Sequence, residues 1–174
     1  QPVSRPSIPD GPYVVAGVGS AGRAAARALQ RLVPRDQILV HDDAPAPSAL
    51  AELGLIRLEL EDGEIPRSIS PAPATLVKSP GIPADAAVVV AARAAGMQVI
   101  DEAELGWRLD PRPQLAVTGT NGKTSTVQLI AQAYSVLGKS AGTIGTLGVG
   151  IYGRLQAGER TTPGRDVRRV PRRR

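Results

Sequence analysis

The chain has 174 residues, of which 42% are hydrophobic, and this is enough for one domain or two small domains with a buried core. It contains no Cys and one His, which excludes disulfides, Cys-based zinc sites and thiol catalysis and leaves little scope for a His-based metal site. The net charge of +5 comes from residues 165–174, which hold six Arg and one Asp, so residues 1–164 are electrically balanced. Neither a secretory signal nor an apolar run of membrane-spanning length is present, so we expect a cytoplasmic protein.

The first segments in chain order predict a β-α-β unit. Residues 1–12 are rich in Pro and Gly and indicate a loose leader. An apolar strand at 13–18 is followed by apolar positions with helical spacing over 20–33, and a second strand at 37–41 ends on Asp42 and Asp43. This is about the length of one half of a nucleotide-binding fold.

The alternation of strands and helices continues to residue 109. The further predicted strands are 55–60, 75–78 and 98–100, and the further predicted helices are 49–53, 84–95 and 101–109. Such alternation predicts an α/β fold with a parallel sheet covered on both faces. We therefore expect a Rossmann-like domain over residues 13–109.

A second domain is predicted after the Pro-rich linker at 110–113. A strand at 115–118, a glycine turn at 119–122 and a helix at 123–137 come first, and a strand at 139–143 and a Gly-rich hairpin from Gly145 follow. We interpret residues 114–164 as the start of a P-loop ATPase-type α/β domain. Residues 165–174 lack apolar periodicity and indicate a disordered Arg-rich tail.

The turn between the strand at 115–118 and the helix has the composition of a phosphate-binding loop. Its glycines allow the backbone to approach an anion closely, and successive N–H groups and the helix N-terminus favour negative charge. Lys123 supplies a positive charge for the β- and γ-phosphates of ATP, and the Thr124 hydroxyl is a candidate ligand for Mg²⁺. The predicted ATP-binding residues are Gly119, Thr120, Asn121, Gly122, Lys123, Thr124 and Ser125. The strict Walker pattern would need Gly where Val117 stands, and the alternative is an ordinary strand–turn–helix with a surface Lys.

Residues 118–125, with the sequence Thr-Gly-Thr-Asn-Gly-Lys-Thr-Ser, closely resemble the ATP loop of the Mur ligases and their folylpolyglutamate synthetase relatives. The resemblance implies an ATP-dependent, amide-forming ligase that activates a substrate carboxylate as an acyl phosphate, which an amine then displaces. In this family the Mg²⁺-binding Glu, a carbamoylated Lys and the amino-acid-binding domain follow later in the chain.

The first half resembles the N-terminal domain of the family member that adds D-glutamate to UDP-N-acetylmuramoyl-L-alanine. The similar features are the turn at 17–22, the acidic end of the second strand, the Ser-Pro-Gly-Ile-Pro loop at 79–83 and the acidic segment at 102–105. The resemblance implies that Gly19, Ser20 and Ala21 meet the diphosphate, that Asp42 or Asp43 meets the uridine, and that Ser79 belongs to the same substrate site. Taken alone, the first turn is also typical of an NAD-binding site, and the loop at 79–83 of a turn imposed by two prolines.

The segment after the ATP loop is similar to a different member of the family, the diaminopimelate- or lysine-adding ligase. The similarity lies in residues 144–148 and in Thr161 and Thr162, which would contact the UDP-linked substrate. A Gly-rich hairpin is the competing interpretation. Because the front half covers about 100 residues, it carries more weight, and D-glutamate is the expected amino acid.

These observations lead to four hypotheses: a fragment of a peptidoglycan-precursor ligase that is inactive alone, a non-catalytic nucleotide-binding module, an Arg-tail nucleic-acid binder and an NAD-dependent oxidoreductase. We favour the first, with no membrane or specific nucleic-acid partner and a monomeric state. The Arg tail lacks interleaved aromatic residues for base stacking, and the NAD hypothesis leaves the second loop unexplained. No catalytic base or amine-binding residue is assigned.

Overall fold

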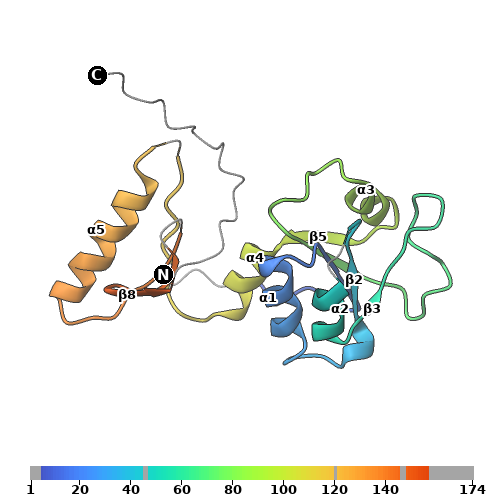
Figure 1. Ribbon diagram of the computed structural model, residues 1–174, viewed down its shortest axis with the longest axis horizontal. Coiled ribbons are helices and arrows are strands. Elements are labelled where there is room, and N and C mark those ends of the chain that lie inside the picture. The colour runs from blue at the N-terminus through green and yellow to red at the C-terminus, as the bar shows by residue number, and fades with distance from the viewer. Residues whose placement is uncertain (1–4, 45–46, 120, 146–147, 157–174) are drawn as a thin grey trace, which may run out of the picture. The chain divides into compact units, whose positions relative to one another are not determined.

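The computed structural model describes residues 5–44, 47–119, 121–145 and 148–156. The chain divides into two compact units, residues 1–114 and 115–174, which we describe separately (Figure 1). The predicted Arg-rich tail lies outside the described residues.

Unit 1 contains a five-stranded parallel sheet with the strand order β3-β2-β1-β4-β5. The strands are β1 (Tyr13–Ala16), β2 (Ile38–His41), β3 (Ile56–Arg57), β4 (Thr75–Lys78) and β5 (Gln98–Asp101). Strands β2 and β3 are added in sequence on one side of β1, and strands β4 and β5 are added on the other side. The order therefore reverses between β1 and β4, as in doubly wound nucleotide-binding folds.

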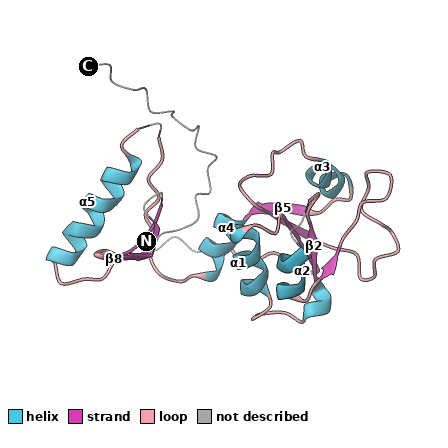
Figure 2. Ribbon diagram, viewed as in Figure 1, coloured by secondary structure: helices cyan, strands magenta, loops and turns pink. Residues whose placement is uncertain are grey.

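Helices cover both faces of this sheet, which confirms the α/β prediction (Figure 2). One face packs against α1 (Ser20–Leu29), α2 (Pro47–Leu53) and α4 (Glu102–Leu109), and the other packs against α3 (Ala87–Ala94). A short 3-10 helix, η1 (Arg35–Gln37), precedes β2. Strands β1, β2 and β4 are almost wholly buried because both faces are covered, and their apolar runs reflect this.

Several predicted elements are shorter in the structure. The first helix ends at Leu29 instead of residue 33, and the chain turns before Pro34. The third strand pairs with β2 at Ile56 and Arg57, and the Leu58 N–H also donates to the Val40 carbonyl at 2.7 Å. Residues 61–64 then form a separate turn through hydrogen bonds between Glu61 and Glu64. Helix α3 begins at Ala87 instead of residue 84, after a turn that follows Pro83.

The described part of the leader is attached to unit 1, so the prediction that it is loose was wrong for residues 5–12. The Tyr13 hydroxyl donates to the Pro9 carbonyl at 2.6 Å, and Thr75 Oγ1 donates to the Asp10 carbonyl at 2.7 Å. The guanidinium of Arg108 donates to the Ser7 carbonyl at 2.8 Å. Pro and Gly prevent regular secondary structure here, but side chains from the sheet and α4 satisfy the leader's carbonyl groups.

Unit 2 consists of α5 (Lys123–Val136) and a three-stranded antiparallel sheet. Its strands are β6 (Gly142–Gly145), β7 (Gly148–Ile151) and β8 (Arg154–Gln156), and the turn at Tyr152–Gly153 makes the predicted Gly-rich hairpin. The predicted strand at 115–118 is absent, and the structure shows irregular chain there with Leu115 69% exposed. A strand needs a hydrogen-bonded neighbour, and no described segment of unit 2 pairs with these residues.

Candidate nucleotide sites

The first candidate site lies at the carboxyl edge of the unit 1 sheet. The glycine turn after β1, the acidic pair after β2 and the loop after β4 all emerge from this edge, because the three strands are parallel neighbours. The β1–β4 junction, where the strand order reverses, is where open α/β sheets bind ligands. The fold thus brings together the residues predicted to bind the UDP group, except for Thr161 and Thr162, which lie outside the described residues.

The glycine turn after β1 delivers the chain into α1. Gly17 has a φ of +86°, and its N–H donates to the His41 carbonyl at 2.7 Å. Gly19 is the N-cap of α1 and is exposed, as is Ser20, whereas Ala21 is half-buried. No side chain caps this helix, and its first turn carries no acidic residue. The exposed N-terminus of α1 is therefore suited to an anionic ligand.

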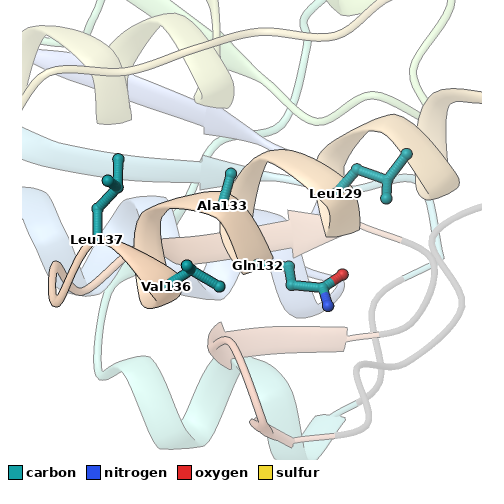
Figure 3. Close-up of a pocket in the computed structure, with 5 residues that line it drawn as sticks. All are labelled: Leu129, Gln132, Ala133, Val136 and Leu137. Carbon is teal, nitrogen blue, oxygen red and sulfur yellow. The ribbon is translucent and has the colours of Figure 1, made fainter.

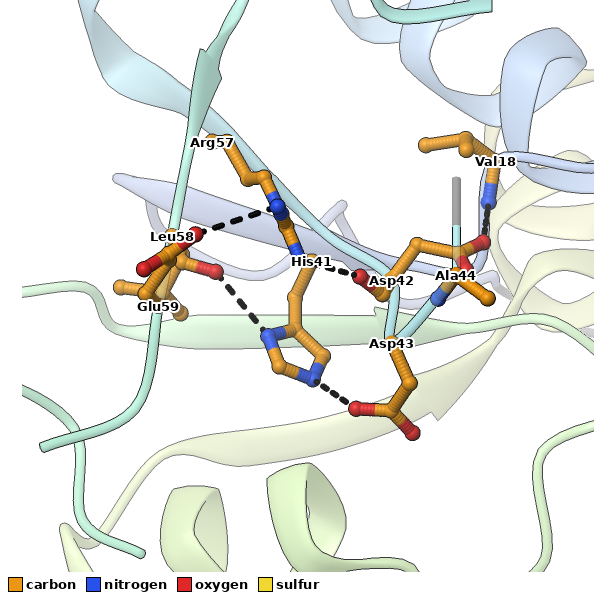
Figure 4. Close-up of polar contacts among 8 residues, drawn as sticks. All are labelled: Val18, His41, Asp42, Asp43, Ala44, Arg57, Leu58 and Glu59. Atoms are coloured by element: carbon orange, nitrogen blue, oxygen red, sulfur yellow. Dashed lines mark hydrogen bonds and ion pairs between the residues drawn. The ribbon is translucent and has the colours of Figure 1, made fainter. Parts of the chain in front are cut away.

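Asp42 and Asp43 have different roles in the structure although they are adjacent. One Asp42 carboxylate oxygen accepts from the Val18 N–H at 2.8 Å, and the other accepts from the Ala44 N–H at 3.0 Å. Asp42 therefore ties the end of β2 to the glycine turn (Figure 4). The side chain of Asp43 is 96% exposed and is the more accessible carboxylate of the two.

Ser79 packs against the glycine turn from the neighbouring strand. Its N–H donates to the Ala16 carbonyl at 3.0 Å, and its hydroxyl lies 3.4 Å from the Gly17 carbonyl oxygen. The Ile82 N–H donates to the Ser79 carbonyl at 3.1 Å, which closes the loop predicted from its two prolines. Ser79 thus supports the shape of the turn.

An ion pair between Lys78 and Asp101 lies beside this loop, at the ends of β4 and β5. Lys78 Nζ lies 2.6 Å from Asp101 Oδ1, and the Lys78 side chain is 18% exposed. Burial raises the pKa of the adjacent Glu102 carboxyl, and the negative charge of Asp101 adds to the effect. Sequence reasoning identified the acidic segment at 102–105 but not the Lys78–Asp101 ion pair beside it.

The second candidate site is the loop before α5. Gly119 and Gly122 have φ angles of +135° and +76°, in the left-handed region that favours glycine. A Cβ at either position would meet no atom within 4 Å, so the backbone faces open space. Gly122 is the N-cap of α5, which has neither a side-chain cap nor an acidic residue in its first turn.

Lys123 folds back over the loop, and its ammonium donates to the Gly119 carbonyl. The positive charge of Lys123 is therefore held at the same end of α5 as the N-terminal N–H groups. Thr124 is half-buried in the first turn, Asn121 and Ser125 are exposed, and Thr126 Oγ1 donates to the Gly122 carbonyl at 3.0 Å. Thr120 lies outside the described residues. Among the residues that the structure describes, no group of three or more His, Cys, Asp or Glu side chains could hold a metal ion.

The opposite half of α5 carries an open recess of about 450 Å³ (Figure 3). Its lining residues are Leu129, Gln132, Ala133, Val136 and Leu137. Most of these side chains are apolar, and none belongs to the loop at 119–125. This recess lacks the chemistry of a phosphate site, so we place the candidate ATP site at the loop.

Comparison with known sequences bears on both units. Residues 117–165 match the family model described as the Mur ligase middle domain. The chain is 36% identical over 148 residues to UDP-N-acetylmuramoylalanine--D-glutamate ligase from Frankia casuarinae, a match that covers 84% of this chain and so must include most of unit 1. This chain belongs to the Mur ligase family.

Two further relatives carry the same printed name. The ligase from Thermobifida fusca is 40% identical over 140 residues, covering 77% of this chain and 29% of the relative, and that from Mycolicibacterium vanbaalenii is 36% identical over 166 residues, covering 87% and 32%. This Mur ligase chain spans about a third of the length of the curated relatives it matches. A solved UDP-N-acetylmuramate-alanine ligase from Thermotoga maritima, 20% identical, matches 78% of this chain and 31% of that one with a TM-score of 0.43, too low to support an argument.

Two residues at the carboxyl edge of this Mur ligase sheet were missed by sequence reasoning. His41 ends β2, and Arg57 of β3 donates to the Asp42 carbonyl at 3.0 Å. The sequence could have indicated His41 as a site residue, because it is the only His of the chain and directly precedes Asp42 and Asp43. The role of Arg57 depends on strand order and could not be read from the sequence.

No helix among the described residues is long and apolar enough to cross a membrane.

Proposed function

We propose that this chain provides the UDP-substrate site and the ATP loop of a ligase that adds D-glutamate to UDP-N-acetylmuramoyl-L-alanine. The observation that carries the proposal is the uncapped, glycine-flanked start of α5 with Lys123 folded over it, within the segment that matches the Mur ligase middle domain. The printed names of the relatives, all D-glutamate ligases, support the choice of substrate and amino acid.

In this proposal the loop holds the phosphates of ATP. The N–H groups at the start of α5 and the ammonium of Lys123 neutralise phosphate charge, and the two glycines leave room for the backbone to approach it. The first turn of α5 contains no carboxylate, so within this loop the Thr124 hydroxyl would be the group that holds Mg²⁺. ATP supplies the phosphoryl group that activates the substrate carboxylate, and the loop contributes position and charge neutralisation.

The carboxyl edge of unit 1 holds the UDP group in this proposal. Gly19, Ser20 and Ala21 at the start of α1 would meet the diphosphate through backbone N–H groups and the helix dipole. Because both carboxylate oxygens of Asp42 already accept backbone N–H bonds, Asp43 is the better candidate for the uridine. Ser79 would act by supporting the turn.

The diaminopimelate- or lysine-adding alternative rests on Thr161 and Thr162, which lie outside the described residues. A non-catalytic nucleotide-binding module is the second alternative, and it predicts the same binding without amide synthesis. Coupling of ADP release to amide-bond formation in the presence of D-glutamate or diaminopimelate distinguishes all three when it is measured on this chain joined to the remaining ligase domains, because the 174-residue chain is expected to be inactive alone.

Calorimetry on the 174-residue chain tests the ATP site. We expect Lys123→Ala to weaken ATP·Mg²⁺ binding at least tenfold, because a full charge facing the phosphates is lost. Thr124→Ala should weaken binding only when Mg²⁺ is present. Lys139→Ala is the matched control, since Lys139 is exposed in the same unit beyond the end of α5. Equal losses for Lys123→Ala and Lys139→Ala, or no ATP binding by the folded wild type, would overturn the proposal.

A further inference from the structure

The only histidine of the chain is buried at the proposed uridine site. His41 is 7% exposed at the end of β2, next to Asp42 and Asp43. Its two ring nitrogens have different partners: Nδ1 lies 3.0 Å from the Leu58 carbonyl oxygen, and Nε2 lies 3.4 Å from Asp43 Oδ1 (Figure 4). The imidazole thus stands between the backbone after β3 and the exposed carboxylate.

The Leu58 contact determines which ring nitrogen carries the proton. A carbonyl oxygen only accepts hydrogen bonds, so Nδ1 must be the N–H donor. In the neutral imidazole, Nε2 then presents a lone pair to the Asp43 carboxylate, and two acceptors do not bond. In the imidazolium, Nε2 carries a proton and attracts Asp43. The ion pair at 3.4 Å therefore exists only when His41 is protonated.

Among the described residues, Asp43 supplies the carboxylate that faces the ring, because the other charged groups nearby have different partners. From β3 and the residues after it, Arg57 Nη1 and Glu59 Oε1 pair with each other at 3.1 Å. The Asp42 carboxylate turns away to the Val18 N–H, while its carbonyl accepts from Arg57. On β1, the residue in register with His41 is the uncharged Ala16.

We infer that His41 is a positioning residue, which in its protonated form orients the Asp43 carboxylate for recognition of the uridine. The inference rests on the proposed UDP site. Asp43 Oδ1 faces the imidazole, so Oδ2 remains for the N–H of the uracil ring or a ribose hydroxyl. Fixing an exposed side chain before the ligand arrives reduces the entropy lost on binding.

The sign of the pH dependence follows from the tautomer. The imidazolium holds Asp43 in place, whereas the neutral ring turns a lone pair toward the carboxylate and repels it. Affinity for the UDP ligand, measured at pH 5.5 and at pH 8, should therefore be higher at the acidic pH by about two- to fivefold, which is the usual contribution of an exposed ion pair. UDP-N-acetylmuramoyl-L-alanine is the probe, because its diphosphate diester does not titrate in this range.

The experiment compares wild type, His41→Asn, His41→Gln and Asp43→Asn by calorimetry on the 174-residue chain. Asn keeps a donor near the position of Nδ1 for Leu58 and loses the contact with Asp43, so binding should be weak at every pH. Gln places a permanent donor near the position of Nε2, so binding should be tight at every pH. Asp43→Asn changes only an exposed side chain and should abolish the pH dependence even if the His41 variants unfold.

The outcomes separate this inference from the proposed function. A pH-dependent wild type with a flat profile in Asp43→Asn supports the role of His41, and rescue by His41→Gln strengthens it. If the wild type binds the probe and Asp43→Asn keeps the same pH dependence, the inference is overturned while the UDP site stands. If the folded wild type does not bind the probe at any pH, the proposed function is overturned and the role of His41 with it.

Discussion

Gly22 is the residue of the first glycine turn with the least space around it. A Cβ built there would lie 1.7 Å from the Gly17 carbonyl oxygen and 3.0 Å from Ser79 Oγ. The main chain of the turn cannot give way easily, because Gly17 is also bonded to His41. Glycine is therefore required here for close packing of the helix on the turn.

We predict that Gly22→Ala destabilises unit 1 by about 3 kcal/mol or more through this backbone overlap. Trp107, the only Trp and part of unit 1, reports the unfolding of that unit in urea. Gly106→Ala is the matched control, because Gly106 lies inside α4 with no atom within 4 Å of the added Cβ. The control should stabilise unit 1 by about 0.5–1 kcal/mol through helix propensity. Equal effects of the two substitutions would contradict the packing argument.

Half-buried Asp110 and exposed Arg112 form an ion pair at the linker predicted from its prolines. The Arg112 guanidinium hydrogen-bonds the carboxylate and lowers the pKa of Asp110 from 3.8 to about 2. Because the native pKa is depressed, any contribution of the pair to stability is present above pH 4 and is lost as the pH falls toward 2.

We predict that Arg112→Gln moves the Asp110 titration back toward pH 4, as followed by carboxyl ¹³C NMR. Arg93→Gln is the control, since Arg93 bonds the Ala84 carbonyl and has no contact with Asp110. If Asp110 titrates near pH 2 in the wild type, in Arg112→Gln and in Arg93→Gln alike, Arg112 is not the cause of its lowered pKa.

At the scale of elements, α5 is a long helix that buries little of its surface in its unit. Ala131 is its buried residue, whereas Leu129, Val136 and Leu137 are 64%, 81% and 70% exposed. In contrast, α1 buries Ala25, Ala26 and Leu29 against the sheet. Most helical stability comes from tertiary packing of an apolar face, so α5 should open far more readily.

We predict that backbone amides of α5 exchange with solvent deuterium at least tenfold faster than those of α1 in the 174-residue chain. Exchange measured by NMR or mass spectrometry checks this, with α3, which buries four residues, as a second reference. Comparable protection of α5 and α1 would mean that packing does not determine their relative stability.

At the scale of the whole molecule, the buried apolar residues are concentrated in unit 1. Two clusters fill the two faces of its sheet, whereas Ala131 is the buried hydrophobic residue in the described part of unit 2. Since burial of apolar surface is the main stabilising term in folding, the two units should differ widely in stability.

We therefore predict two steps in urea unfolding. Helical circular dichroism should fall first as α5 is lost, and the fluorescence of Trp107 should change later as unit 1 unfolds. Coincident midpoints for the two signals would refute this order.

The sequence alone determined the alternation of strands and helices in unit 1 and the glycine turn before α5. Apolar periodicity, helix-breaking prolines and glycines are local properties, and they predicted both the covered parallel sheet and the loop with the family resemblance. Helix ends and the length of β3 were less well predicted, because short turns that apolar periodicity does not reveal lie next to these elements, as before Pro34, after Pro83 and at 61–64.

Only the tertiary structure shows that Asp42 and Asp43 have different roles. Nothing local distinguishes Asp42 from Asp43, but the order β3-β2-β1-β4-β5 places the first against the glycine turn and the second beside the ring of His41. The predicted strand at 115–118 failed for a related reason. Strand propensity becomes a strand only when a neighbouring segment satisfies its backbone hydrogen bonds, and that partner is a property of the fold and not of the residues themselves.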